Sequence, residues 1–295
     1  MRVLLVEDKV DFAKAVELAV TAIPTCELVW ARSRDSALAR LYEQDFDLII
    51  IDRRIPSADD VLDDSVEHGF RVFQAAREIA IGTPVWFLTG TEDADFAAEI
   101  ANTYASKANL HGSGDLSPLV LVVWKKKLDE AMCRIRTFAQ HQAELEAIAI
   151  QNADGINFAA AEERNLRIFA RMYGASSVEV TALGGLSGAR VLKVVARNAS
   201  GRLLHTAVAK IGNIATMHDE HGRLQRDISR LKQGGFPSLS VKIDAGSAGI
   251  GGLYYGMVGP DVTSLFQRLA AGEDIALNIS TRLQRSEEHT SELQS

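Results

Sequence analysis

Residues 46–52 read Phe46-Asp47-Leu48-Ile49-Ile50-Ile51-Asp52, a short apolar run with an aspartate at its end. A β-branched run of this length, bounded by polar residues, is typical of a strand buried on both faces of a parallel sheet. Asp52 then stands at the carboxyl end of the strand. Because ligands bind at that edge of open α/β sheets, the run predicts a functional site at Asp52.

Three other apolar runs end in a polar residue in the same way. Residues 3–6 precede Glu7 and Asp8, residues 85–88 precede Thr89, and residues 119–124 precede Lys125. Helical periodicity appears between the runs. The alternation predicts an α/β fold with a doubly wound, five-stranded parallel sheet.

The strand ends carry, in chain order, an acid pair, an acid, a hydroxyl and a lysine. This pattern resembles that of the receiver domain of bacterial two-component response regulators. The resemblance covers residues 1–127 and implies a flavodoxin-like fold. It implies that a sensor histidine kinase or a phosphotransfer protein phosphorylates Asp52, and that Thr89 and Lys125 contact the phosphoryl group. It also implies a cytoplasmic signalling protein.

The acidic residues support the same chemistry independently. Glu7, Asp8 and Asp52, if close together, raise one another's pKa unless a cation neutralises them. Mg²⁺ prefers carboxylate and phosphate oxygens, so it is the expected metal. An ionised Asp52 can then attack a phosphoryl donor and form an acyl phosphate.

Alternatives remain open for several of these residues. Glu7 and Asp8 could cap a helix that begins near Lys9, since acids favour helix N-termini. Lys107 or Lys126 could replace Lys125 as the phosphate-pairing lysine. We prefer Lys125 because residues 94–110 read as a helix ended by Gly112.

Two features depart from the family pattern. Residues 57–68 form a longer and more acidic loop than is usual after the phosphoacceptor strand. Lys126 stands where the family commonly has proline. The loop could alter access to Asp52, or it could be only a solvated loop.

Composition limits the remaining classes of function. The chain has 295 residues, enough for two domains, and a net charge of −7 that argues against nucleic-acid binding. Its two cysteines are too few for a disulfide framework. We expect no membrane segment and no signal peptide.

Residues 128–155 are predicted to form a helical linker. Apolar residues recur in a heptad-like pattern, interrupted by Gln142, so the segment 128–149 could pair with a second copy or pack on its own domain. Asn152 to Gly155 breaks the pattern and marks the expected domain boundary.

Residues 156–284 change to strands separated by glycine turns. The expected order is a strand, a glycine loop, two strands, the second of which ends in Val208-Ala209-Lys210, and a helix. This order resembles the amino-terminal lobe of protein kinases and aminoglycoside phosphotransferases. It also resembles the ternary-complex-associated domains. The resemblance implies an ATP site in which Lys210 pairs with Glu220. The loop residues that would approach the phosphates are Gly184, Gly185, Ser187 and Gly188.

The alternative for this segment is a β-rich module that binds no nucleotide. No catalytic-loop aspartate with its asparagine follows residue 259, so we expect only a partial α+β lobe and leave enzymatic activity open. Residues 285–295 resemble a translated sequencing adapter, or else a disordered tail, and no function is assigned to them. Two hypotheses result: a phosphoacceptor switch that controls the lobe, or a lobe that binds ATP beside a receiver used only for docking.

Overall fold

The apolar run around Ile50 forms β3 (Leu48–Asp52), in which all five residues are buried. It lies at the centre of a sheet with the order β2-β1-β3-β4-β7, and every pairing is parallel. The other strands are β1 (Arg2–Val6), β2 (Glu27–Ala31), β4 (Val85–Thr89) and β7 (Val120–Trp124). The predicted five-stranded parallel sheet is confirmed in this computed structural model, which describes residues 1–90, 94–183, 188–227, 238–257 and 272.

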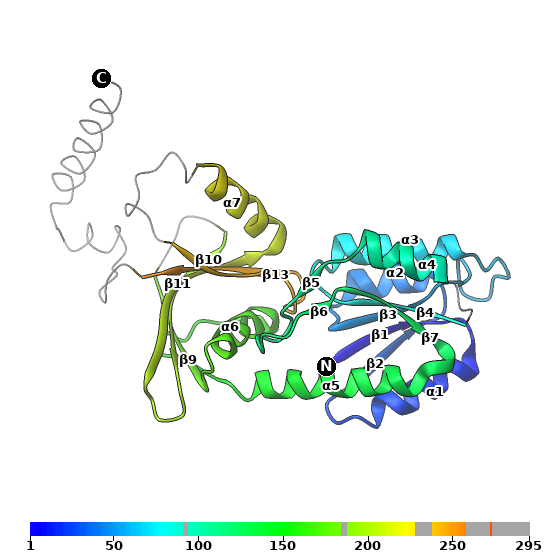
Figure 1. Cartoon of the computed structure of the whole chain (residues 1–295), viewed down its shortest axis with the longest axis horizontal. Helices are drawn as coiled ribbons and strands as arrows, with labels where there is room; N and C mark the ends of the chain where they lie inside the picture. The colour runs from blue at the N-terminus through cyan, green and yellow to red at the C-terminus, as the bar shows by residue number, and fades with distance from the viewer. Residues whose placement is uncertain (91–93, 184–187, 228–237, 258–271, 273–295) are drawn as a thin grey trace, which may run out of the picture.

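Helices cover both faces of this sheet (Figure 1). The helices α1 (Val10–Thr21) and α5 (Leu128–Glu146) pack on the face that presents Leu5 and Ile50. On the other face, Ile49 and Ile51 pack against α2 (Arg34–Glu43), α3 (Val66–Ile79) and α4 (Ala94–Thr103). Successive residues of β3 thus enter different cores, which explains why the whole run must be apolar.

The helix expected over residues 94–110 is shorter than predicted. It ends at Thr103, and a hairpin of β5 (Lys107–Ala108) and β6 (Ser117–Pro118) follows it. Gly112 and Gly114 in the connection have φ of +72° and +94°, a conformation that glycine adopts at little cost. These glycines serve the hairpin turn and do not end a long helix.

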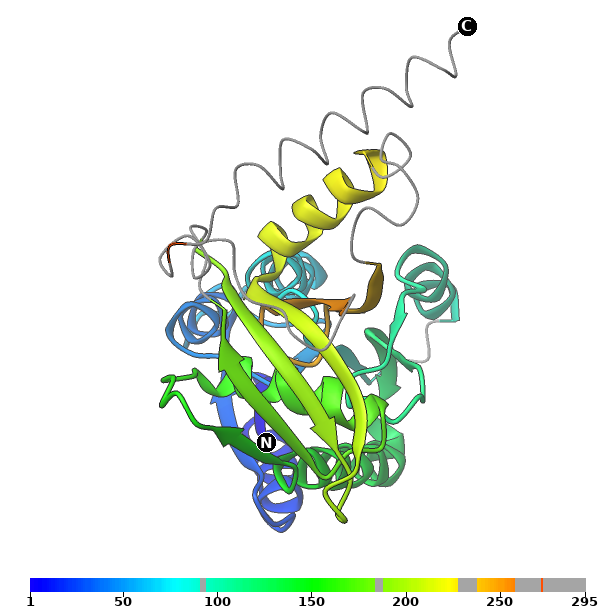
Figure 2. The same ribbon diagram turned by 90° about the vertical axis from the view of Figure 1, so that its left-hand side faces the viewer.

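A second sheet has the order β12-β13-β11-β10-β9-β8. All its pairings are antiparallel except the one between β8 and β9. Its strands are β8 (Ala149–Asn152), β9 (Ser177–Ala182), β10 (Arg190–Arg197), β11 (Leu203–Asn213), β12 (Leu239–Ile243) and β13 (Ile250–Gly256). The helix α6 (Ala160–Met172) packs in its core, and α7 (Ile214–Asp227) lies on the other side, above the sheet in Figure 2.

The helical linker expected over residues 128–155 ends early. After a short 3₁₀ turn (Lys125–Lys127), α5 ends at Glu146, and residues 149–152 form β8 of the second sheet. The expected boundary at Asn152 to Gly155 therefore falls inside the second domain. A four-residue strand directly after a long helix offers too little periodicity to be recognised.

The heptad-like stripe of α5 is used within the chain. Met132 and Ile135 lie in the first domain's core, and Leu145 lies in the second domain's core. Because these side chains are at most 4% exposed, the structure favours packing within the chain, one of the two alternatives that the sequence left open for this stripe. Among the described helices, none has both the length and the apolar composition to cross a membrane.

The two domains meet at the amino ends of the parallel strands. Arg164 of α6 forms an ion pair with Asp47, which precedes β3. The Gly246 amide donates to the Gly82 carbonyl at 3.1 Å. At Gly246, whose φ is +83°, a Cβ atom would lie 2.1 Å from the Leu110 carbonyl oxygen. Only glycine therefore allows the backbone at Gly246 to lie this close to the backbone at Leu110.

Candidate functional site

Three carboxylates lie together at the carboxyl end of the parallel sheet. Glu7 and Asp8 follow β1, and Asp52 ends β3, whose Ile51 pairs with Val6 of β1. One carboxylate oxygen from each acid lies within 4.8 Å of the others. Glu7 is completely buried and Asp52 is 5% exposed. The fold therefore brings together the three acids that the sequence singled out.

Lys125 is the lysine that reaches this cluster. It directly follows β7, and its Nζ lies 2.8 Å from Asp52 Oδ2 and 2.6 Å from Glu7 Oε2. The same ammonium lies 4.9 Å from the centre of the Phe12 ring, a contact that the sequence did not suggest. Lys107 lies on the hairpin and Lys126 is exposed, so the geometry favours Lys125 over both.

The electrostatics of the cluster show an excess of negative charge. Burial, and next the charge of Asp52, raises the pKa of Glu7 to about 7. Burial also raises the pKa of Asp52, although Lys125 opposes the shift. Burial alone would lower the pKa of Lys125, but the neighbouring Asp52 and Glu7 outweigh it and raise that pKa. One lysine does not balance three acids, and an added cation would.

Backbone groups hold the carboxylates in place. The Lys9 amide donates to Glu7 Oε1 at 3.2 Å, and the Arg54 amide donates to Asp52 Oδ1 at 3.4 Å. Asp8 Oδ1 is buried and has no hydrogen-bond partner among the described residues. An unsatisfied carboxylate oxygen beside two other carboxylates is a donor set that suits Mg²⁺.

Thr89 ends β4, the strand between β3 and β7. It pairs in register with Trp124, the residue before Lys125, and it is 5% exposed. Its position at the same sheet edge follows from strand order alone. The four strand ends that carry Glu7, Asp52, Thr89 and Lys125 are thus neighbours.

The acidic segment expected as a loop over residues 57–68 runs in the structure only to Ser65, the residue before α3, and it is anchored to the first domain. Ser33 Oγ donates to Asp59 Oδ1 at 2.6 Å, and Arg32 pairs with Asp60 at 3.1 Å. Arg54 pairs with Asp64 at 2.8 Å. Several of the loop's acids therefore have partners.

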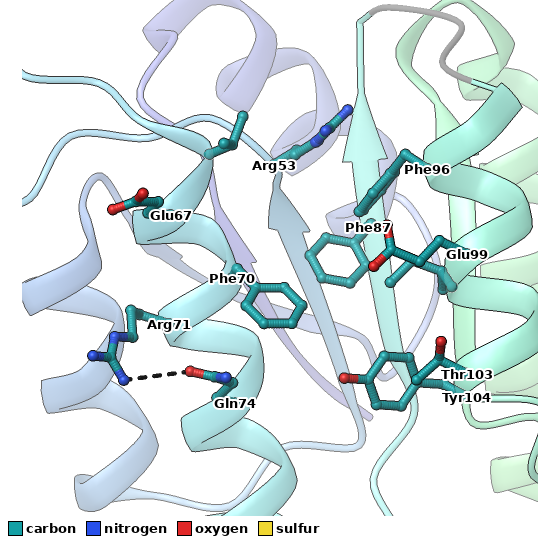
Figure 3. A pocket seen from close by; sticks show the side chains of 12 residues that line it. Arg53, Glu67, Phe70, Arg71, Gln74, Phe87, Phe96, Glu99, Thr103 and Tyr104 are labelled. Carbon is teal, nitrogen blue, oxygen red and sulfur yellow. Dashed lines mark hydrogen bonds between the residues drawn. The ribbon is translucent and has the colours of Figure 1, made fainter.

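A groove beside the acid cluster was not foreseen from the sequence. It has a volume of about 620 Å³ and lies between α3 and α4 (Figure 3). Arg53, the residue after Asp52, lies 4.1 Å from the centre of the Phe96 ring at one end of this groove, and Phe70 and Phe87 form its wall. The sequence signal that could have indicated this groove is the presence of aromatic residues on both α3 and α4.

The second domain brings together only part of its expected site. Lys210 on β11 forms an ion pair with Glu220 on α7, as the sequence suggested. Gly188 precedes β10 and has open space where a side chain would lie. The other loop residues, Gly184, Gly185 and Ser187, lie outside the described residues.

A family model described as the response regulator receiver domain matches residues 3–108. The amino-terminal domain is therefore a response regulator receiver domain of a two-component system. Its five-stranded parallel sheet and its acid cluster are consistent with this class. The match ends before β7 and Lys125 and does not extend to the second domain.

Several solved receiver structures are similar to this chain. The Francisella response regulator 1452 receiver domain is 20% identical, with a TM-score of 0.35, and the match covers 48% of this chain and 98% of that one. The CheY-like receiver protein from Methanospirillum hungatei JF-1 is 15% identical, with a TM-score of 0.34 and coverage of 48% and 97%. The receiver domain of a putative Luxo repressor protein from Vibrio parahaemolyticus is 21% identical, with a TM-score of 0.33 and coverage of 48% and 93%. No curated protein matches the chain.

Proposed function

We propose that Asp52 accepts a phosphoryl group from the phosphohistidine of a sensor kinase or phosphotransfer protein, with Mg²⁺ held by Glu7, Asp8 and Asp52. The observation that carries this proposal is the buried three-carboxylate cluster with one lysine among its oxygens. The anchored loop at residues 57–65 borders this edge and would form part of the surface that the donor meets.

The chain's own groups divide the work. A carboxylate oxygen of Asp52 attacks the phosphorus atom, the phosphorus–nitrogen bond of the donor breaks, and the imidazole leaves with the electron pair and takes up a proton. Mg²⁺, when bound, neutralises charge on the carboxylates and the transferred phosphoryl oxygens. Lys125 and the Thr89 hydroxyl contact those oxygens after transfer, which reports the modification to β4 and β7.

Acetyl phosphate with Mg²⁺ tests the phosphoacceptor. Intact-protein mass spectrometry of the full chain should show the addition of one phosphoryl group, absent in Asp52→Asn. Asp45→Asn is the matched control, because it neutralises an exposed carboxylate near the other end of the same strand. Failure of the native chain to gain mass, or an adduct that persists in Asp52→Asn, would reject Asp52 as the acceptor.

The metal has its own test. Saturating the native chain with Mg²⁺ at 100 times its Kd should raise the free energy of unfolding by about 2.7 kcal/mol. Asp8→Asn removes one donor and should weaken the Mg²⁺ affinity, measured by calorimetry, while leaving the circular dichroism spectrum unchanged. Equal affinities for the two proteins would remove Asp8 from the metal site.

Phosphorylation would bias the second domain through α5, which begins three residues after Lys125. Coupling free energies between sites are typically about 1–3 kcal/mol, whereas moving an equilibrium from 1:99 to 99:1 requires about 5.5. We therefore expect a shift in the state of the second domain and not a complete switch.

A second candidate function is nucleotide binding by a kinase-like second domain. It is favoured by the Lys210–Glu220 ion pair beside a strand that follows a glycine-rich loop. Calorimetry with ATP and Mg²⁺ should then show binding that Lys210→Ala abolishes and Lys14→Ala, an exposed lysine of α1, does not. Undetectable ATP binding by the native chain would favour a β-rich module without a nucleotide.

A further inference from the structure

A second cavity, of about 390 Å³, lies far along the sheet from Asp52, near the amino ends of β4 and β7. It is bounded by these strands, the β5–β6 hairpin and α5. Its apolar lining includes Trp86, Leu110, Leu121 and Phe138. The volume and the mixed lining are those of a site for one small molecule.

His111 is a buried polar residue in the lining of this cavity. It is 5% exposed, its ring packs edge-on against Phe138 with 4.4 Å between ring centres, and its Nε2 is buried without a partner among the described residues. Burial, followed by the charges of His141 and Arg171, lowers its pKa to about 4, so the ring is neutral at pH 7. Buried imidazole rings are normally hydrogen-bonded, and a ligand in the cavity meets the His111 side chain as part of the lining.

The rim of the cavity carries one group of each charge. Arg134 on α5 and Asp115 in the hairpin both line the cavity and are exposed. Within the described part of the chain, neither forms an ion pair. A ligand that complements this rim has a carboxylate for Arg134, an ammonium for Asp115 and an apolar ring for the interior.

We propose that this cavity binds a free aromatic amino acid whose ring carries an O–H or N–H group, as in tyrosine or tryptophan. The ring lies among Trp86, Leu121 and Phe138, and its polar hydrogen is donated to the neutral imidazole of His111. The α-carboxylate pairs with Arg134 and the α-ammonium with Asp115.

Such a ligand would act on the junction between the domains. The His111 carbonyl accepts from Arg171 of α6 at 3.5 Å. At the next residue, Gly112, a Cβ atom would lie 2.4 Å from the Ile168 carbonyl oxygen, so the hairpin lies directly against α6. A bound ligand would therefore contact a hairpin that itself lies against the second domain, at a place remote from Asp52.

Calorimetry on the full chain with four probes tests each contact. L-Tyrosine should bind with one-to-one stoichiometry, whereas L-phenylalanine, tyramine and 3-(4-hydroxyphenyl)propionate each lack one polar group and should bind about tenfold more weakly. His111→Phe keeps an aromatic ring in place and should abolish the preference for tyrosine over phenylalanine. Arg134→Gln, on the exposed side of α5, should abolish the preference for tyrosine over tyramine.

Arg136→Gln is the matched control, since Arg136 is exposed on the same helix and does not line the cavity. It should leave all four affinities unchanged. No saturable binding of L-tyrosine at millimolar concentration would overturn the proposal. Binding in which both variants keep the native preferences would place the ligand elsewhere and overturn it as well.

Discussion

Strand β3 has an aspartate near each end, and the two ends of the parallel sheet use these acids differently. At the amino end, Asp47 faces one guanidinium, that of Arg164, and accepts from the Arg2 amide at 2.7 Å. At the carboxyl end, Asp52 shares one lysine with Glu7, and Asp8 lies beside them. Balanced charges hold a junction together, whereas unbalanced charges prepare a site for an added cation and a phosphoryl group.

Gln142 adds to the balance at the amino end. With its carboxamide oriented to satisfy its neighbours, its oxygen accepts from Arg164 Nη2 at 2.9 Å and from Nε at 2.7 Å. The polar residue that interrupts the apolar stripe of α5 thus binds the arginine that joins the domains. Because this position is buried, the hydrogen bonds to Arg164, and not exposure to solvent, account for a glutamine in the apolar stripe.

Substituting Asp47 should have the largest effect on stability of the changes that test this comparison between the two ends of the sheet. Asp47→Ala leaves the guanidinium of Arg164 without its carboxylate at a site where both side chains are at least four-fifths buried, and should lower the free energy of unfolding by about 3–5 kcal/mol. Urea denaturation followed by circular dichroism measures the change. Asp219→Ala breaks the exposed pair with Arg223 and should leave the urea midpoint unchanged. Equal effects of the two substitutions would show that the Asp47–Arg164 pair contributes no more to stability than an exposed ion pair.

A glycine substitution tests the close approach at the same junction. Gly246→Ala would combine an unfavourable positive φ with a clash against the Leu110 carbonyl, and should cost about 3 kcal/mol. Gly201→Ala is the control, because its φ is +78° but no atom lies within 4 Å, so it should cost only about 1 kcal/mol. If the two variants had the same urea midpoint, the backbones at Gly246 and Leu110 would be able to move apart without loss of stability.

The pH dependence of stability should have opposite signs at the two ends. Without divalent metal, the folded chain binds more protons at Glu7 between the ordinary pKa of 4.5 and the raised value of about 7, so this group's contribution falls as pH rises through that window. At His111, the unfolded chain binds more protons between about 4 and 6.5, so its contribution rises with pH there. Each slope is at most about 1.4 kcal/mol per pH unit.

Single variants separate the two contributions. Glu7→Gln removes the first, so its stability relative to the native chain should increase as pH rises from 5 to 7. His111→Phe removes the second, so its relative stability should increase as pH falls from 6.5 to 5. Chemical denaturation at a series of pH values, with EDTA present, measures both. Two variants with the same sign of pH dependence would contradict the assignment.

The sequence predicted what depends on local pattern. The strand ends that carry Glu7, Asp52 and Thr89 could be found because each lies at the end of an uninterrupted apolar run. Placing Lys125 at the cluster needed the further judgement that residues 119–124 form a strand, and the geometry supports it.

What the sequence could not predict depends on contacts distant along the chain. Asp47 gave no signal because its partner, Arg164, lies 117 residues away. The stripe on α5 revealed a buried face but not what covers it, which left pairing with a second copy and packing within the chain both open. The strand β12 is a different case, because its signal is local: Leu239, Val241 and Ile243 alternate with polar residues, as in a half-buried strand, and the pattern was overlooked.

The helix α5 also determines whether the chain can be divided. It has 19 residues, about 28 Å of helix, and contributes Met132 and Ile135 to one core and Leu145 to the other. A cut at residue 127 would remove α5 from the receiver and leave only α1 on that face of the parallel sheet, and a cut at residue 155 would take the strand β8 from the second sheet. Because one helix contributes to both cores, we expect a division on either side of α5 to lower the stability of at least one domain.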